Sequence, residues 1–373
     1  MRHRLASPAS TIEQAVGDLV VLHATEAATV YLSTRARLGS FDAAELERKL
    51  YDERSLLRVL AMRRTLFVTP VVGLPVIHAA CSRALAEREH RASVQRIEKA
   101  GIADDGDDWL GRVKAAALAA LADRGEATAA ELSAAVPELR RQIPHGVGTN
   151  WEGSTSVGSL VLTVLSAEAR IARGRPRGTW LSNQYRWVPM ERWLPDGVAD
   201  FDLPTVDAQA DLALAWLASF GPGTMRDLKW WTGWTMADTR RAIAAVDAVE
   251  VELEAGGTGF VLAGDLEPIG RPDPWVALLP ALDSTVMGWA ERDWYVGDHA
   301  PTVFDSAGNA SPTVWCDGRV VGAWAVREDG EVVCRLFDDI GSEATSAVMA
   351  KAESLSDWLS DRARPRFRTR LRL

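Results

Sequence analysis

The 373-residue sequence has few of the residues that build metal centres and disulfide frameworks. Its three cysteines, Cys81, Cys316 and Cys334, are far apart and odd in number, which predicts a reducing compartment rather than paired disulfides. No His-x-x-x-His or Cys-x-x-Cys spacing occurs, and no Gly-rich nucleotide-binding loop is present. We therefore expect no metal ion and no cofactor.

Long hydrophobic runs are also missing. No apolar stretch reaches the roughly 18 residues that a membrane helix needs. The first four residues lead into a polar segment without the apolar core of a secretion signal. We expect no contact with a membrane and a location in the cytoplasm. The chain is 47% hydrophobic and 25% charged, the balance of an ordinary soluble protein, which excludes fibrous and wholly disordered classes.

Lysine is scarce, because five lysines contribute to a total of 42 basic residues. The net charge of −9 argues mildly against nucleic-acid binding, but the charge is unevenly distributed. Residues 201–300 hold 16 acidic and 6 basic side chains, whereas residues 1–100 hold 11 acidic and 15 basic ones. The sequence therefore allows a basic, DNA-facing surface outside the acidic stretch.

An order of three helices followed by a β-hairpin occurs twice. Thr128, Thr224 and Thr235 each precede an acidic residue by three positions, the pattern of a helix capping box. The predicted helices are 109–121, 128–137, 157–167, 207–219, 224–234 and 235–246, and the predicted strands are 170–173, 184–188, 249–253 and 260–262. This order is typical of winged helix-turn-helix domains and indicates an internal repeat.

The two ends of the chain have different patterns. Helices are expected near 11–22, 27–38, 41–50 and 74–97, with one strand at 65–68, as in a degenerate first copy of the repeat. From Trp275 onward, short β-prone pieces are separated by turns such as Asp317-Gly318. A helix is expected at 346–362. Arginines then alternate with mostly apolar residues over 364–372, which predicts a strand with a cationic face.

Three ordered motifs resemble a known family. They are Ala215–Pro222 with Asp227–Gly233, then Leu278–Asp283 with Gly288-Trp289 and Arg292-Asp293, and last Asp305, Gly308-Asn309, Pro312–Val314 and Asp317–Trp324. Together they are similar to the bacterial winged-helix DNA glycosylases of the AlkZ/YcaQ type, which unhook alkylated bases and interstrand crosslinks. The resemblance extends over nearly the whole chain.

The resemblance implies a fold that is mainly α with β. Tandem winged helix-turn-helix domains are followed by a C-terminal β-barrel, and together they form a C-shaped clamp around double-stranded DNA. On this basis the winged-helix domains are expected at 1–103, 104–200 and 201–270, and the barrel at 271–373. Several winged units in one chain suit a nucleoid-associated monomer that encloses a single duplex, whereas operator-binding regulators usually act as dimers.

The catalytic signature of that family differs here. Its Gln-x-Gln or Gln-x-Asp falls on His23 and Thr25, just before Tyr31-Leu32. The last residue of its Arg-Gly-Thr-Leu-His motif falls on Phe67. The resemblance therefore places an imidazole and a hydroxyl at the two catalytic positions.

These groups suit hydrolysis of an N-glycosidic bond, which passes through an oxocarbenium-like state. An N7-alkylated purine is already a cationic leaving group, so the enzyme needs only to place and activate one water molecule. His23 would act as base or water-orienting group, Thr25 would co-orient the water, and Glu26 would stabilise the cation. The structural alternatives are a hydrogen-bonding role for His23, an N-cap at Thr25 and a first-turn charge at Glu26.

DNA contacts are expected from two arginine groups. Arg63 and Arg64 lie between a helix and a strand, where they suit phosphate contacts or a surface salt bridge. Arg173, Arg175 and Arg177 lie at a Gly/Pro-rich hairpin tip, as a wing touching phosphates would. The tryptophans at 230–234 are interpreted mainly as core packing, with base stacking as the alternative.

These residues and the resemblance lead to two alternative candidate functions. The first is a monofunctional glycosylase, since none of the few lysines lies near His23 in sequence to form a Schiff base. The second is a non-catalytic protein that binds duplex DNA or its lesions and has lost the chemistry. The changes at His23, Thr25 and Phe67 favour the second, whereas the retention of polar groups at both signature positions favours the first.

Overall fold

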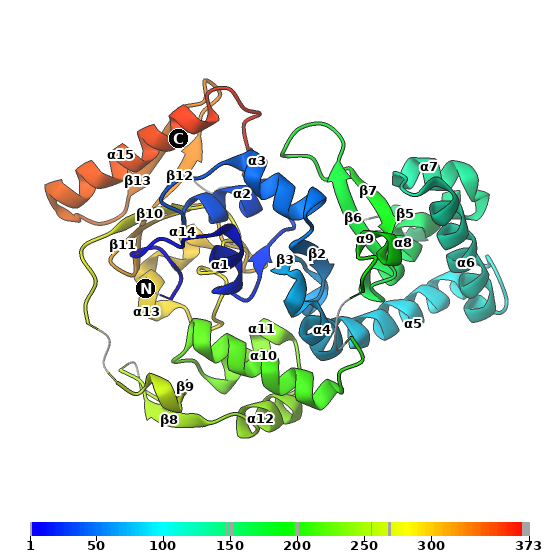
Figure 1. The fold of residues 1–373 in the computed structure, drawn as a ribbon, viewed down its shortest axis with the longest axis horizontal. Helices are drawn as coiled ribbons and strands as arrows, with labels where there is room; N and C mark the ends of the chain where they lie inside the picture. The colour runs from blue at the N-terminus through cyan, green and yellow to red at the C-terminus, as the bar shows by residue number, and fades with distance from the viewer. Residues whose placement is uncertain are drawn as a thin grey trace.

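The computed structural model describes residues 2–146, 148–149, 152–197, 201–254, 256–267 and 270–367. The chain forms a mixed α/β structure whose N-terminal segment lies between the other parts (Figure 1). Residues 106–189 lie on one side of this segment, residues 205–262 lie below it, and the C-terminal sheet and helix lie on the other side. In the described part of the chain, no helix combines the length and apolar character needed to cross a membrane.

The N-terminal segment is built around a small antiparallel sheet with the strand order β1-β3-β2. Its elements are α1 (Ile12–Gly17), β1 (Leu22–His23), α2 (Ala27–Arg35), α3 (Ala43–Glu47), β2 (Leu56–Leu60), β3 (Leu66–Pro70), α4 (Leu74–Ile77) and α5 (Arg83–Lys99). The sequence predicted β3 but neither β1 nor β2, and the helix expected over 11–22 ends at Gly17, before β1. β2 was missed because all five of its residues are buried and show no alternation of polar and apolar positions. A π-helix, His78–Ser82, joins α4 to α5.

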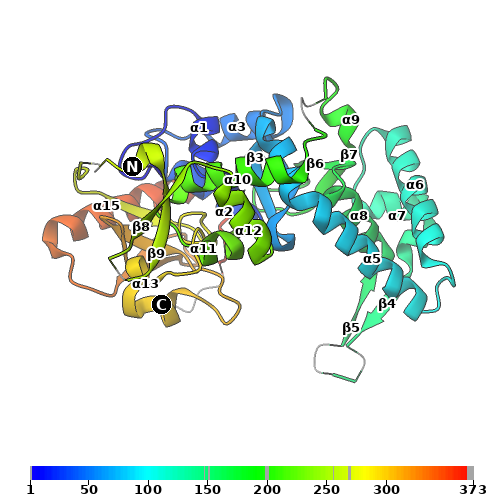
Figure 2. The same ribbon diagram turned by 90° about the horizontal axis from the view of Figure 1, so that it is seen from below.

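The second segment has a hydrophobic core of its own, formed by α6, α7, α8 and one face of β7. Its elements are α6 (Gly106–Arg124), α7 (Ala129–Ala135), β4 (Gln142–His145), β5 (Gly153–Ser156), α8 (Val157–Ala167), β6 (Ile171–Pro176), β7 (Tyr185–Pro189) and α9 (Met190–Trp193). The capping box predicted at Thr128 is confirmed. The β4–β5 hairpin, which the sequence did not predict, projects from the body of the molecule (Figure 2).

The third segment repeats the order of three helices and a hairpin. Its elements are α10 (Thr205–Phe220), α11 (Met225–Thr232), α12 (Met236–Ala244), β8 (Ala248–Glu252) and β9 (Thr258–Leu262). Thr224 forms a complete capping box with Asp227, and Thr235 accepts a hydrogen bond from the Asp238 N–H group. Both predicted helix starts are therefore confirmed, because short polar side chains satisfy the free N–H groups of the first turn.

The C-terminal segment contains an open four-stranded antiparallel sheet with the order β10-β11-β12-β13. Its elements are β10 (Val276–Leu279), α13 (Asp293–Val296), α14 (Ala300–Val303), β11 (Thr313–Cys316), β12 (Arg319–Val326), β13 (Val332–Leu336) and α15 (Gly341–Leu359). Within the described ranges, β10 and β13 remain edge strands and do not pair, so the expected closed barrel is not found. The predicted turn at Asp317-Gly318 is confirmed, and both of its residues have positive φ.

The C-terminal arginine strand is not observed where the structure describes it. Residues 363–367 have no regular secondary structure, and the remainder of the predicted strand lies outside the described residues. Arg364 donates instead to the backbone carbonyl of Glu328, and Phe367 packs against Trp324 with ring centroids 5.7 Å apart. Contacts with the sheet thus replace the predicted strand pairing over these residues.

The largest hydrophobic core joins the N-terminal, third and C-terminal segments. A fully buried ion pair crosses this junction, with Arg37 Nη2 2.7 Å from Asp283 Oδ1. Ser33 and Thr285 add hydrogen bonds of 2.5 and 2.8 Å to the same pair. These contacts fix α2 against the loop after β10, and this loop supports the candidate site described next.

Candidate active site and nucleic-acid interface

His23 lies on β1 directly opposite Phe67 of β3. Its side chain is buried, with 7% of the residue exposed, and its ring lies edge-on to that of Phe67 at a centroid distance of 5.5 Å. The His23 N–H donates to Ser284 Oγ at 3.3 Å, and this hydroxyl donates to the Val21 carbonyl at 2.8 Å. Two segments that are far apart in sequence therefore hold the backbone of His23 in place, and Phe67 contacts its ring.

The imidazole of His23 is neutral at physiological pH. Its pKa is lowered to about 4, chiefly by burial and also by the charge of Arg63, against an opposing effect of Asp283. The Thr25 N–H donates to His23 Nδ1 at 3.4 Å, which favours the tautomer that carries its proton on Nε2. No residue in the described ranges forms a hydrogen bond with Nε2. The site thus supplies an N–H donor rather than a strong base.

Thr25 and Glu26 follow at the entrance to α2. Glu26, not Thr25, occupies the N-cap position, and its side chain makes no capping hydrogen bond. The interpretation of Thr25 as the N-cap is therefore wrong, because the chain enters the helix one residue later. Thr25 is exposed, and its carbonyl accepts a hydrogen bond of 3.5 Å from Asn183 Nδ2 in the loop between β6 and β7.

Arg63 and Arg64 form the turn between β2 and β3 and have φ angles of 53° and 63°. Such left-handed conformations are costly for residues other than glycine and tend to occur at functional sites. Arg64 Nε lies 3.0 Å from Glu89 Oε2. Arg63 has no hydrogen bond or ion pair with any described residue, and its Cζ lies 4.0 Å from the centroid of the Trp230 ring.

The three arginines of the predicted wing have different surroundings. Arg173 donates to Ser166 Oγ at 2.7 Å and stacks on Trp187. Arg175 forms ion pairs with Glu47 and Asp52. Arg177 is exposed, and no described residue forms a hydrogen bond or ion pair with its side chain. Arg177 is therefore the wing arginine without a hydrogen bond or ion pair to a described residue, although its charge acts on Glu131.

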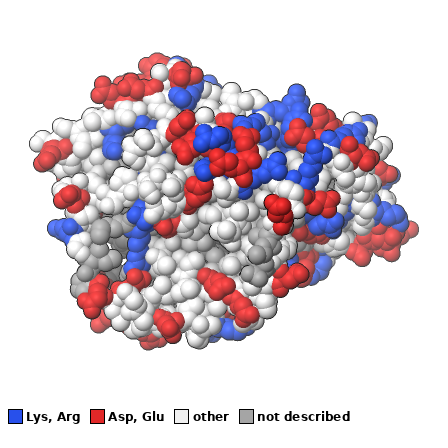
Figure 3. Space-filling view, in the orientation of Figure 1, with Lys and Arg blue, Asp and Glu red and all other residues white. Residues whose placement is uncertain are grey.

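The loop between β6 and β7 packs against other parts of the chain. Trp180 Nε1 donates to the Ala363 carbonyl at 3.0 Å, and its ring contacts those of Tyr31 and Trp358. The face shown in Figure 3 carries basic and acidic side chains interspersed, and its described surface has no continuous basic tract. Any phosphate contacts on this face would come from individual arginines.

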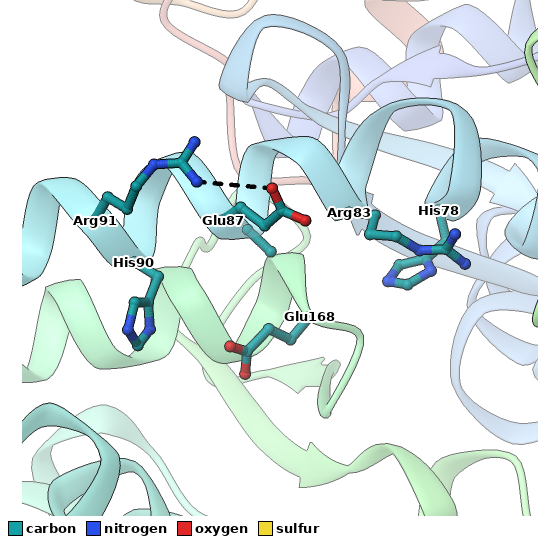
Figure 4. Close-up of a pocket in the computed structure, with 7 residues that line it drawn as sticks. His78, Arg83, Glu87, His90, Arg91 and Glu168 are labelled. Atoms are coloured by element: carbon teal, nitrogen blue, oxygen red, sulfur yellow. Dashed lines mark ion pairs between the residues drawn. The ribbon is translucent and has the colours of Figure 1, made fainter. Parts of the chain in front are cut away.

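A pocket of about 350 Å³ lies elsewhere, between α5 and the residue that follows α8 (Figure 4). Arg83, Glu87, His90 and Arg91 line it from one face of α5, and Glu168 lies opposite them. Most of these charges are compensated: Glu87 pairs with Arg91, His90 with Asp107 and Glu168 with Lys114. No sequence pattern indicates this pocket, because a π-helix and a contact between segments form it.

Among the described residues, no three His, Cys, Asp or Glu side chains are grouped so that they could hold a metal ion.

The polar groups of the site that sequence reasoning missed are Ser284, which contacts His23, and Asn183, which contacts Thr25. Neither belongs to a local motif with these residues, and only the fold brings them together.

Comparison with known proteins identifies the family of this chain. The family model described as "DNA glycosylase AlkZ-like" matches residues 16–358, and the chain belongs to this family. A curated relative from Streptomyces sahachiroi, an interstrand DNA cross-link repair glycosylase, is 29% identical over 160 residues. That match covers 40% of this chain and 43% of the relative, less than half the length of either.

The fold is similar to a solved structure. The structure of Streptomyces sahachiroi DNA glycosylase AlkZ superposes with a TM-score of 0.72 at 20% identity. The superposition covers 97% of this chain and 95% of that one. The chain therefore shares the mixed α/β architecture of that glycosylase over almost its full length.

Proposed function

We propose that this protein is a monofunctional DNA glycosylase that hydrolyses the N-glycosidic bond of alkylated or crosslinked purines in double-stranded DNA. The observation that carries the proposal is the neutral, firmly held imidazole of His23 in a chain of the AlkZ-like family. Its Nε2 is available to a water molecule, and the exposed Thr25 hydroxyl lies two residues further on.

In this mechanism His23 positions the water rather than deprotonating it. Nε2–H donates to one lone pair of the water oxygen, Thr25 accepts one of its hydrogens, and the second lone pair attacks the anomeric carbon. The C–N bond breaks with its electron pair moving to the cationic base, which leaves neutral. Glu26 supplies negative charge to the oxocarbenium-like state and receives the released proton.

DNA binding is proposed for the arginines without internal partners, Arg63 and Arg177, with Arg64 beside the site. Arg173 and Arg175 would support the same surface by holding the β6–β7 hairpin. The helix-helix-helix-hairpin units would act as winged helices, with the open C-terminal sheet as the remnant of the barrel, around one duplex. The protein would act as a monomer in the cytoplasm, on the nucleoid.

A single-turnover assay on a duplex containing N7-methylguanine tests the proposal. Wild type is expected to produce abasic sites. His23→Ala should lower the rate constant by about 100-fold, the scale of one positioned polar group. His23→Gln, which restores the residue type of the family, should stay within about tenfold of wild type because an amide N–H can replace Nε2–H.

The pH profile separates the two roles of His23. Since its pKa is about 4, the ring stays neutral and the rate constant should be flat from pH 6 to 9 and fall only as the pH approaches 4. A rate that rises through pH 6.5 would instead indicate a base with an unshifted pKa. His90→Gln, remote from the site and paired with Asp107, is the control variant and should behave as wild type.

A second candidate is a non-catalytic protein that binds lesions in duplex DNA. The low pKa of His23 and its 7% exposure favour this alternative, because a weakly basic, enclosed ring contributes little to proton transfer. Tight binding of the damaged duplex with no abasic product from wild type would support it and exclude the glycosylase.

A further inference from the structure

Two arginines share one indole ring beside the candidate site. The Cζ of Arg63 lies 4.0 Å from the Trp230 ring centroid, and the Cζ of Arg292 lies 4.8 Å from the same centroid. The two guanidinium carbons are therefore at most 8.8 Å apart. Arg63 comes from the β2–β3 turn, Trp230 from α11 and Arg292 from the start of α13, so three segments meet here.

Neither arginine forms an ion pair with a described residue. Arg292 donates from Nε to the Trp289 carbonyl and from Nη1 to the Gly308 carbonyl. The charge of the neighbouring carboxylate, Asp227, acts on Arg292, but Asp227 is buried and accepts from the Thr224, Ala290 and Glu291 N–H groups. Two like charges are thus held close together without an ion pair in the described part of the chain, an arrangement that favours binding of an anion.

The backbone has left-handed φ angles on both sides of the Arg63–Trp230 contact. Arg63 has a φ of 53°, and α11 ends at Gly233, which has a φ of +78°. A Cβ at position 233 would lie 3.2 Å from Arg63 Cγ, so glycine leaves room for the arginine stem. Burial and the charge of Arg292 lower the pKa of Arg63 to about 10, which still leaves it protonated at neutral pH.

We propose that Arg63 and Arg292, aligned on Trp230, bind a single backbone phosphodiester of the DNA strand that carries the target nucleotide. Two guanidinium groups in charge-assisted contact with one phosphate place each Cζ roughly 4 Å from phosphorus, and so lie roughly 8 Å apart at most. This span is close to the 8.8 Å upper limit that the two ring distances set. The charge of Arg63 acts on His23, which places the phosphate next to the water-positioning group. This phosphate clamp, formed by Arg63, Trp230 and Arg292, rests on the proposed function. It gives Arg292 and Trp230 a role in positioning the substrate.

The test measures binding alone. Duplexes with an uncleavable tetrahydrofuran abasic analogue would carry one neutral methylphosphonate at each backbone position around it in turn. Wild type should lose about tenfold in affinity at one position, and Arg63→Gln should be insensitive to methylphosphonate at that same position. Arg63→Gln should also reduce the slope of log K against log salt by about 0.9.

Variants separate the clamp from a structural role. Arg63→Gln removes no hydrogen bond, and it removes both the favourable contact with Trp230 and the repulsion from Arg292, so its melting temperature should stay close to that of wild type. Arg292→Lys retains the charge and should recover part of the affinity that Arg292→Gln loses. Because both arginines would hold one phosphate, the double Gln variant should lose less than the product of the two single losses. Arg48→Gln, which removes an exposed guanidinium paired with Glu53, is the matched control.

The outcomes distinguish the clamp from the enzyme. Identical methylphosphonate profiles for wild type and Arg63→Gln would overturn the clamp, even if excision is observed. A phosphate-specific loss confined to wild type would support the clamp, even if no base is excised and the glycosylase proposal fails. Binding of inorganic phosphate at the two arginines without any affinity for duplex DNA would show a free-anion site and overturn the proposal.

Discussion

At the scale of single residues, buried histidines are the most unusual feature of this chain. His3, His23 and His78 all have a pKa lowered by burial, to about 3, 4 and 4. His78 stacks on Phe201 at 4.6 Å, and both of its ring nitrogens are buried without a hydrogen-bond partner. Each of these rings is neutral when folded, and each takes up a proton near pH 6.5 when unfolded.

This difference predicts acid lability. Because the folded pKa of His78 is lowered, its contribution to stability is present above about pH 6.5 and is lost as the pH falls toward 4. His78→Phe should reduce the pH dependence of the unfolding free energy between pH 4.5 and 6 by about 1.4 kcal/mol per pH unit. It should also raise the unfolding free energy at pH 7 by roughly 1 kcal/mol, since the two buried ring nitrogens of His78, which have no hydrogen-bond partner, are then absent.

Urea denaturation across this pH range measures both effects. His78→Gln serves as control, because it removes the titration and keeps a buried polar group. It should show the same loss of pH dependence without the gain at pH 7. An unchanged pH dependence in both variants would contradict a lowered pKa for His78.

At the scale of elements, the buried pair Arg37–Asp283 decides how α2 meets the loop after β10. Arg37 makes two contacts of 2.9 and 2.7 Å with the two carboxylate oxygens of Asp283. The next residue, Ser284, holds the backbone of His23. The ion pair thus holds α2 against the loop after β10. Through Ser284, it also helps to fix the backbone of His23.

Removing the negative charge of this ion pair should lower the stability of the folded protein. Asp283→Asn is expected to lower the unfolding free energy by about 3 to 5 kcal/mol, because it leaves the Arg37 charge buried and unpaired. The double substitution Arg37→Met with Asp283→Leu should recover most of that loss. Thermal or urea unfolding of the three variants measures this, and a loss below about 1 kcal/mol for Asp283→Asn would mean that water reaches the pair.

At the scale of the whole molecule, the described residues form three main hydrophobic clusters and a small one. The first core joins the N-terminal, third and C-terminal segments, and the second belongs to α6, α7, α8 and neighbouring residues. The third packs α2 and α15 against the C-terminal sheet. Leu60, Leu85, Ala86 and Ala167 form the small cluster. Local stability can therefore differ between the first and second cores.

Hydrogen exchange should reveal this division. Leu110 is fully buried in the second core, and Leu110→Ala is expected to cost about 2 to 5 kcal/mol there. Amides of α6 and α8 should exchange faster, while those of α10 and β11 keep wild-type protection. Leu279→Ala, fully buried in the first core, should give the reverse pattern. Uniformly faster exchange in either variant would show a single cooperative unit.

Local features were predictable from sequence wherever a short-range signal exists. The caps at Thr128, Thr224 and Thr235 were predicted because a capping box lies within four residues. The hairpin turn at Asp317-Gly318 was predicted for the same reason. The wholly buried β2 and the β4–β5 hairpin were missed, since neither shows the alternation of a half-buried strand.

The sequence by itself determined most of the helices, the capped helix starts at Thr128, Thr224 and Thr235, the repeated helix-hairpin order and the family. Only the tertiary structure decided that Ser284 supports His23, which lies 261 residues away, and that Arg63 and Arg292 share the ring of Trp230. The physical reason is range: caps and turns are set by neighbouring residues, whereas burial and the charges around an imidazole depend on the packing of distant segments.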